Sequence, residues 1–142
     1  MIVLTYDHGG YEIMQKIKTH LDSLGLEYID VNGKYEPSDS YVEYGIKANV
    51  EMLKHDGSVG IYMCRSGVGM TIVANKGKGI RAANCFSEKI AEMSRRHNDA
   101  NVCVLPADYI DFDTMLKVID TFLNTEFEGG RHKSRVDALN AL

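Results

Sequence analysis

The sequence predicts an α/β fold in which a five-stranded parallel sheet is covered by helices on both faces. Short apolar runs rich in β-branched residues alternate with longer runs of helical periodicity, and glycines punctuate the junctions. Such alternation favours right-handed crossovers between parallel strands. A chain of 142 residues fits one compact domain, so we expect residues 1–142 to fold as a single unit.

The chain begins with a strand, a helix and a second strand. Residues 2–6 are short, apolar and β-branched and stop at a turn-forming Asp-His-Gly-Gly cluster, which indicates a buried strand. Apolar residues recur at helical spacing over residues 11–24, and a glycine ends that helix. A second strand lies near residues 27–31, and a polar loop at 32–40 leads to a helix over residues 41–53.

The middle of the chain places a glycine-rich loop between a strand and a short helix. The third strand is expected at residues 59–64, the loop at 65–69 and the helix at 70–75. A fourth strand near residues 80–84 precedes a helix that runs from the N-cap Ser87 to His97.

The last third adds one strand and two helices. The strand is expected at residues 101–105 and the first helix at residues 113–124. After a Gly-Gly pair, an amphipathic helix is expected over residues 131–142.

Three loops of this sheet share one edge. Ligands of parallel sheets bind beyond the carboxyl ends of the strands, where the strand order reverses. We therefore expect the functional site among residues 7–10, 65–69 and 84–87.

Composition and charge exclude several classes of protein. The chain is 44% hydrophobic and 25% charged, which excludes disorder, collagen-like repeats and coiled coil. A net charge of -4 and a pI of about 5.7 disfavour a nucleic-acid partner. No apolar run approaches the roughly 20 residues that a membrane span needs, and no signal peptide is evident. We expect a cytoplasmic protein that is complete from its first residue and has no membrane partner.

Cysteine chemistry centres on Cys64, at the end of the third expected strand. Cys64, Cys85 and Cys103 form no Cys-x-x-Cys pair, so reduced thiols are favoured over a disulfide frame or a zinc site. A following helix N-terminus and the cation of Arg65 would favour the thiolate of Cys64, and the loop amides could hold an enediolate or another oxyanion. The alternative is that Cys64 is a small hydrophobic residue at the end of a buried strand.

The loop glycines allow two interpretations. Gly67 and Gly69 match part of a dinucleotide-binding fingerprint, but Ile72 stands at its third glycine. A tight strand-to-helix turn is therefore favoured over nucleotide binding.

Other candidate residues offer proton transfer or anion binding. Asp7 and His8 follow the first strand, where they could orient a hydroxyl and handle protons or phosphate, although a simple turn is the alternative. His97 ends a basic helix, where a histidine is commonly only a favourable charge. Arg131 and Arg135 are four residues apart and could receive a phosphate, or form a solvated basic face. No cluster of metal ligands is evident in the sequence.

Six motifs, spread in order over nearly the whole chain, together resemble one family. The chain resembles the type B ribose-5-phosphate isomerases and the related galactose-6-phosphate isomerase subunits. The motifs are Asp-His-Gly-Gly at 7–10, Cys-Arg-Ser-Gly-Val-Gly-Met at 64–70, Ala-Asn-Lys at 74–76, Gly-Ile-Arg-Ala-Ala at 79–83, Arg-His-Asn-Asp-Ala-Asn-Val at 96–102 and Glu-Phe-Glu-Gly-Gly-Arg-His at 126–132. This resemblance implies a Rossmann-like three-layer α/β/α sandwich and no metal or organic cofactor. It also implies a homodimer, sometimes paired into a tetramer, with active sites at the subunit interface and the helix 131–142 packed there.

The resemblance also implies a reaction, the isomerisation of a phosphorylated aldose to a ketose through a cis-enediol. The default substrate is ribose 5-phosphate, which gives ribulose 5-phosphate. Cys64 would be the base that moves a proton between C1 and C2. Ser66 and the loop amides would stabilise the enediolate, and Gly67 and Gly69 would shape that loop.

The remaining roles follow from the same resemblance. His97 would open the sugar ring with help from Asp7, contributed across the interface. Asn98 would bind sugar hydroxyls. The phosphate would be held by residues from both ends of the chain, namely His8, Arg131 and Arg135.

Three positions depart from the family pattern. Arg65 follows the cysteine where the family usually has glycine, and Asp108 stands where a phosphate-binding arginine is common. Ser40 replaces a carboxylate that precedes Tyr41 in the usual Asp-Tyr-Pro. Either Arg65 substitutes for the missing arginine, or the pocket takes a different sugar, one with a shifted or absent phosphate.

Other functions remain as alternatives. The retained cations favour a phosphorylated pentose, hexose or tetrose, so galactose, allose and tetrose phosphates stand beside ribose 5-phosphate. A non-catalytic partner subunit is disfavoured by the presence of Cys64, Ser66 and His97. A nucleotide-binding module lacks its third glycine, and a thiol redox sensor lacks a resolving cysteine nearby.

Overall fold

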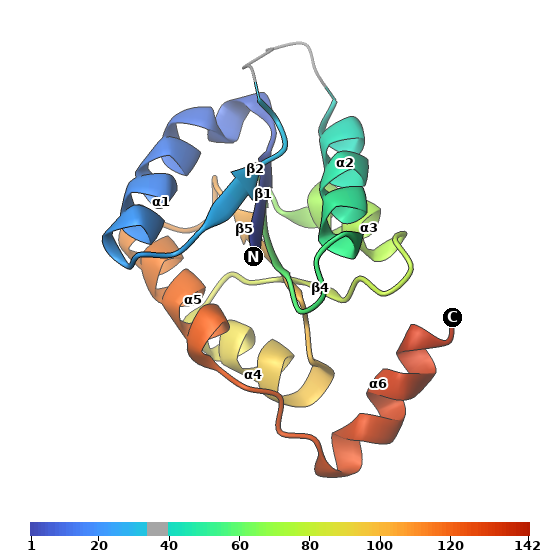
Figure 1. The fold of residues 1–142 in the computed structure, drawn as a ribbon. Helices are drawn as coiled ribbons and strands as arrows, with labels where there is room; N and C mark the ends of the chain where they lie inside the picture. Colours follow the sequence, from blue (N-terminus) through green and yellow to red (C-terminus); the bar gives the residue numbers. More distant parts are fainter. Residues whose placement is uncertain (34–39) are drawn as a thin grey trace.

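A computed structural model of the chain describes residues 1–33 and 40–142 (Figure 1). Most of the expected polar loop, residues 34–39, lies outside the described residues. The described residues form a five-stranded sheet of order β2-β1-β3-β5-β4, in which every neighbouring pair is parallel. The strands are β1 (Ile2–Tyr6), β2 (Tyr28–Asp30), β3 (Val59–Cys64), β4 (Ala82–Asn84) and β5 (Val102–Pro106). The predicted α/β fold with a parallel sheet is confirmed.

Helices cover both faces of the sheet and make it the middle of three layers (Figure 1). One face carries α1 (Tyr11–Ser23), α4 (Glu88–Asn98) and α5 (Phe112–Asn124). The opposite face carries α2 (Tyr41–Leu53) and α3 (Val68–Asn75). The last helix, α6 (Lys133–Asn140), extends away from the sheet at the C-terminal end of the chain (Figure 1).

The central strands are buried on both faces, which explains their nearly continuous apolar sequences. In β3, Ile61 and Met63 join the core beside α1, α4 and α5, whereas Tyr62 and Cys64 join the core beside α2 and α3. This alternation follows from the two-residue period of a strand. It places the Cys64 side chain on the α2–α3 face of the sheet.

Three expected boundaries were wrong, each for a local reason. The helix after the glycine loop begins at Val68 rather than at residue 70, because Gly67 is its N-cap. The fourth strand begins at Ala82 rather than at residue 80, because the Ile80 amide donates to the Gly77 carbonyl and the Arg81 amide donates to the side chain of Asn101. These amides are therefore unavailable to the sheet. The expected Ser87 N-cap of α4 is confirmed, since its hydroxyl accepts a hydrogen bond from the Ile90 amide at 3.2 Å.

The C-terminal helix also starts later than expected. Residues 130–132 form a short 3-10 helix, η2 (Gly130–His132), and the regular helix spans residues 133–140 instead of 131–142. Gly129 and Gly130 both have positive φ, and the His132 amide donates to the Gly129 carbonyl three residues back. This tight turn replaces the first turn of the expected helix.

The strand order places a topological switch point between β1 and β3. The chain moves from β1 to β2 on one side, whereas β5 and β4 lie beyond β3 on the other. The loops after β1 and β3 therefore lie next to each other at the carboxyl edge of the sheet. None of the helices within residues 1–33 and 40–142 is long and apolar enough to cross a membrane.

Candidate functional site

The loop after β3 has a backbone that only glycine allows. Gly67 has a φ of 76° and is the N-cap of α3. A Cβ atom at Gly67 would lie 2.2 Å from Oδ1 of Asn84, and one at Gly69 would lie 2.7 Å from the ring of Tyr41. The two glycines thus hold a tight strand-to-helix turn directly after Cys64, as the sequence analysis favoured.

Hydrogen bonds fix the polar groups of this loop. The Ser66 hydroxyl accepts a hydrogen bond from the Val68 amide at 3.2 Å, which leaves its own proton to donate elsewhere. Cys64 is buried, with 6% of its surface exposed, and its carbonyl accepts from the Ala107 amide at 3.0 Å. The thiol therefore ends a buried strand immediately beside the loop.

The side chain of Asn84 holds the glycine loop through a hydrogen bond, a role that was not expected from the sequence. Its Nδ2 donates to the Ser66 carbonyl at 3.1 Å. Its Oδ1 is buried and has no hydrogen-bond partner among the described residues. The available signal was a polar residue at the carboxyl end of a short strand whose other residues, Ala82 and Ala83, are apolar.

Asp7 and His8 follow β1 and meet the same edge. The Asp7 amide donates to the Met63 carbonyl at 3.1 Å, and its carboxylate accepts from the Gly10 amide at 3.1 Å. Burial raises the pKa of Asp7, although the Gly10 hydrogen bond and the nearby charges of His8 and Arg65 oppose this shift. His8 is exposed in the 3-10 helix η1 (His8–Gly10).

The Arg65 side chain contacts the loop that follows β5 and lies near the loop that follows β1. Its Nε donates to Oδ2 of Asp108 at 2.8 Å, and the Asp108 amide donates to the Arg65 carbonyl at 2.9 Å. Its Cγ lies 3.8 Å from where a Cβ at Gly9 would be. The Arg65 side chain is 76% exposed, and the hydrogen bond that it donates to the Asp108 carboxylate raises the pKa of Arg65. The guanidinium is thus anchored through one nitrogen at the rim of the site.

His97 lies at the other end of the sheet. It is near the C-terminus of α4, and β5 begins only five residues later and runs toward Cys64, whose partner in the sheet is Pro106. The length of β5 alone separates the two edges by about 13 Å. One chain therefore does not bring Cys64 and His97 together.

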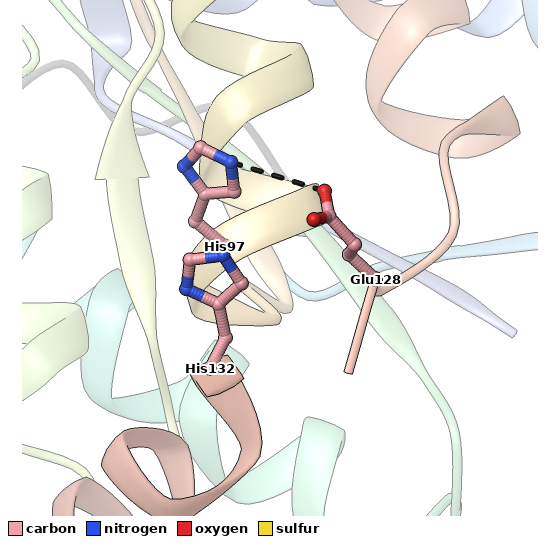
Figure 2. Close-up of side chains that lie close together, drawn as sticks. All are labelled: His97, Glu128 and His132. Carbon is pink, nitrogen blue, oxygen red and sulfur yellow. Dashed lines mark ion pairs between the residues drawn. The ribbon is translucent and has the colours of Figure 1, made fainter. Parts of the chain in front are cut away.

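A second set of side chains surrounds His97 (Figure 2). The rings of His97 and His132 stack with centroids 4.4 Å apart and an angle of 18° between their planes. Nε2 of His97 lies 3.9 Å from Oε2 of Glu128. Burial, helped by the nearby His97 and Arg131, lowers the pKa of His132. Glu128 and His132 were not among the expected site residues, although both belong to the last of the six motifs.

This set does not have the geometry of a metal centre. Ligand atoms of His97, Glu128 and His132 lie within 4.8 Å of one another. However, the lone pairs of an imidazole lie in its ring plane, and two stacked, nearly parallel rings direct them side by side rather than toward one point. We therefore interpret the set as a histidine pair beside a carboxylate.

The remaining expected ligands lie near this second set. Asn98 ends α4 and is exposed. Arg131 lies in η2 rather than in the helix, and Arg135 lies in α6. Nη1 of Arg135 donates to the Arg131 carbonyl at 3.0 Å, so the two arginines still share one side of this segment. Both are exposed.

The candidate residues thus fall into two groups at opposite edges of the sheet. We call the first the cysteine half-site; it comprises Asp7, His8, Cys64, Arg65, Ser66, Gly67 and Gly69. We call the second the histidine half-site; it comprises His97, Asn98, Arg131 and Arg135. The cysteine half-site contains the thiol and the glycine loop, whereas the histidine half-site contains the His97 imidazole and the two C-terminal arginines.

Comparison with known proteins identifies the family. A model of the Ribose/Galactose Isomerase family matches residues 2–139. The chain belongs to this family. The expected resemblance is confirmed, and with it the assignment as an aldose–ketose isomerase of sugar phosphates.

Curated members of the isomerase family are similar over almost their whole length. A probable ribose-5-phosphate isomerase B of Mycoplasma pneumoniae is 37% identical over 141 residues, which cover 99% of this chain and 93% of that protein. The ribose-5-phosphate isomerase B of Escherichia coli K12 is 34% identical over 136 residues, which cover 96% of this chain and 91% of that protein.

Solved structures of the isomerase family share the fold. A ribose 5-phosphate isomerase of Thermotoga maritima superposes with a TM-score of 0.92 at 37% identity, covering 99% of this chain and 97% of that one. A ribose-5-phosphate isomerase B of Mycoplasma genitalium, solved with bound ribulose-5-phosphate, superposes with a TM-score of 0.93 at 33% identity, covering 99% and 93%.

The three positions at which this isomerase departs from the family pattern all make hydrogen bonds to neighbouring residues. Arg65 and Asp108 contact each other, as described above. Ser40 is the N-cap of α2, and its hydroxyl accepts from the Val42 amide at 3.2 Å. All three departures therefore make local contacts of their own.

Proposed function

We propose that this isomerase interconverts a phosphorylated aldose and its ketose through a cis-enediol, with Cys64 as the base and ribose 5-phosphate as the default substrate. The observation that carries the proposal is the placement of Cys64 at the carboxyl end of β3, directly before a glycine loop that presents Ser66 and the α3 N-terminus. A base and oxyanion donors on one short segment are what enolisation requires.

Enolisation moves one proton between adjacent carbons. The Cys64 thiolate takes the proton from C2 of the open-chain aldose, and the bonding electrons shift so that negative charge develops on O1. The Ser66 hydroxyl and the loop amides stabilise that charge. The Cys64 thiol then returns the proton to C1 while the O2 proton passes to O1, so that C2 becomes the carbonyl carbon of the ketose and O1 its C1 hydroxyl.

The ring must open before enolisation. We assign this step to His97, which exchanges protons with the ring oxygen and the C1 hydroxyl, with help from the Asp7 of a second copy. An imidazole suits this role because one of its nitrogens can donate a proton while the other accepts one.

Cations from both half-sites hold the phosphate in this proposal. His8 and Arg65 come from the cysteine half-site, and Arg131 and Arg135 come from the histidine half-site. Planar guanidinium groups suit phosphate because they donate paired hydrogen bonds. Asn98 binds sugar hydroxyls, and no metal or organic cofactor is needed.

Each complete site is proposed to combine the two half-sites of different chains in a homodimer, which could pair further into a tetramer. Exposed apolar side chains at helical spacing on α2, with two more on α3, support a protein partner for this face. They are Val42, Ile46, Val50, Leu53, Val68 and Ile72. The α6 segment, which extends from the body of the chain, packs at the interface in this proposal.

An isomerisation assay tests the proposal. The purified protein and the Cys64→Ala variant are assayed against ribose, allose, galactose and erythrose phosphates, with the unphosphorylated sugars beside them. We expect turnover of ribose 5-phosphate that Cys64→Ala abolishes without loss of the circular-dichroism signal. Turnover by the variant would overturn the role of Cys64, and an inactive wild type would favour a non-catalytic partner subunit.

A second candidate function is the isomerisation of a different sugar phosphate. The observation that favours it is the ion pair between Arg65 and Asp108 at the rim of the cysteine half-site. Preference for an allose, galactose or tetrose phosphate in the same assay would support this candidate.

A further inference from the structure

We propose that Glu128 and His132 are positioning residues that hold the His97 imidazole in the orientation that ring opening requires. This inference rests on the proposed ring-opening role of His97. It extends the histidine half-site by two side chains that need not touch the sugar.

The two residues hold the imidazole from different directions (Figure 2). His132 lies against the face of the His97 ring, at 4.4 Å between centroids, and so limits its rotation. Glu128 lies beside the ring edge, with Oε2 at 3.9 Å from Nε2 of His97. Together, a stacked face and a carboxylate at one nitrogen select one ring orientation.

Both positioning residues are themselves anchored. The Glu128 amide donates to the Arg96 carbonyl at 3.0 Å, and Nη2 of Arg96 donates to Oε2 of Glu128 at 3.1 Å. Arg96 also pairs with Glu92 one turn earlier in α4, at 3.1 Å. His132 is buried, with only 8% of its surface exposed. The loop after α5 is thus tied to the end of α4 at the position of His97.

The charged groups around His97 come from α4 and from the loop after α5. The Glu128 carboxylate lies 3.9 Å from Nε2 of His97. His132 stacks on the ring, and burial lowers the pKa of His132 and so favours its neutral form. The nearby cation of Arg96 is offset by its two carboxylate partners, Glu92 and Glu128.

If Glu128 and His132 act through His97, changing either residue should impair ring opening and leave enolisation unchanged. Ring opening involves His97, whereas enolisation of an open-chain sugar involves Cys64 at the opposite half-site. Ribulose 5-phosphate cannot form a five-membered ring, because the oxygen that would close it carries the phosphate. Exchange of its C1 hydrogen with solvent deuterium therefore reports enolisation without ring opening.

The test compares these two rates in the full-length protein. For Glu128→Gln we expect at least about a tenfold loss in the isomerisation of ribose 5-phosphate, with exchange on ribulose 5-phosphate within about twofold of the wild type. Glu128→Asp should restore part of the loss. Glu126→Gln, which removes an exposed carboxylate from the same segment, is the matched control and should change neither rate.

His132 is tested by variants that separate stacking from its nitrogen atoms. His132→Phe keeps an aromatic face and should keep more isomerisation activity than His132→Ala. Thermal unfolding checks that each variant folds; Glu128→Gln changes an exposed side chain and keeps the proposal testable if the His132 variants do not fold.

Two results would overturn the inference. One is an unchanged isomerisation rate in Glu128→Gln, and the other is an equal loss of isomerisation and exchange, which would indicate a role in folding or binding. The His97→Asn variant separates this failure from failure of the proposed function. If His97→Asn loses isomerisation and keeps exchange while Glu128→Gln matches the wild type, only the inference fails; if His97→Asn also keeps isomerisation, the ring-opening role of His97 fails.

Discussion

The guanidinium of Arg65 and the carboxylate of Asp108 are bound to each other, with Nε 2.8 Å from Oδ2. Both residues depart from the family pattern, and they lie 43 positions apart in the sequence. The pair offsets the negative charge of Asp108. Because the side chains are largely exposed, with 76% and 45% of their surfaces accessible, the pair contributes little to stability.

Removing Arg65 should weaken the binding of a phosphorylated substrate. For Arg65→Ala we expect the KM for ribose 5-phosphate to rise about tenfold, because the variant loses a charge-assisted hydrogen bond to the phosphate. Asp108→Ala should instead leave the KM unchanged or lower it, because it removes a carboxylate that repels the phosphate and keeps the Arg65 guanidinium. Steady-state kinetics of the two single variants and the double variant check this. Additive effects would show that the pair does not act as a unit.

Two inactive variants should restore activity to each other. Cys64→Ala removes the base from one half-site, and His97→Asn removes the ring-opening group from the other. If each site combines two chains, a mixed dimer contains one intact site, and random mixing should recover about a quarter of the wild-type activity. The measurement is activity after joint refolding of the two variants, with each variant refolded alone as the control. No recovery would mean that both groups act within one chain.

Gly67→Ala should both destabilise the fold and impair the loop. The alanine would have to adopt a φ of 76°, and its Cβ would meet Oδ1 of Asn84 at 2.2 Å. We expect a loss of at least about 1–2 kcal/mol in the free energy of unfolding, measured by urea denaturation. Gly57→Ala is the matched control for the backbone term, because Gly57 also has a positive φ, but among the described residues beyond its chain neighbours none comes within 4 Å of its Cβ position. Equal losses in the two variants would show that Asn84 adds nothing.

The carboxyl group of Asp7 should make stability depend on pH. Its folded-state pKa is raised by burial above the ordinary value of 3.8, so the folded chain binds more protons than the unfolded chain in the window just above pH 3.8. The contribution of Asp7 to stability is therefore largest below that window and falls as the pH rises through the folded-state pKa. Asp7→Asn should become progressively more stable than the wild type across this window. Urea titrations at several pH values check this, and a constant difference would contradict it.

The strands and the glycine loop could be predicted because their signals are local. An apolar run of five or six residues predicts a buried strand by itself. A glycine pair directly after such a strand likewise predicts a tight turn, without knowledge of the rest of the fold. The contact between Arg65 and Asp108 is not visible in this way, because it depends on the register that pairs Cys64 with Pro106. Sequence reasoning could place both residues at one edge but not in contact.

The residues around His97 could not be predicted from the sequence for the same reason, because they come from separate segments of the chain. Glu128 and His132 reach it because the segment after α5 returns along the end of α4, and a backbone hydrogen bond and an ion pair between Arg96 and Glu128 set that path. The late start of α6 was also hidden, since two consecutive glycines at positive φ convert its first turn into a 3-10 turn.

The separation of Cys64 from His97 by the length of β5 has a consequence for how the rate responds to dilution. If each site combines two chains, as proposed above, a lone chain carries two unmatched halves of a site and can be folded without being able to complete a turnover. Activity per chain would then rise with protein concentration and level off once the chains are paired. Dissociation alone would switch the isomerase off without any residue being modified.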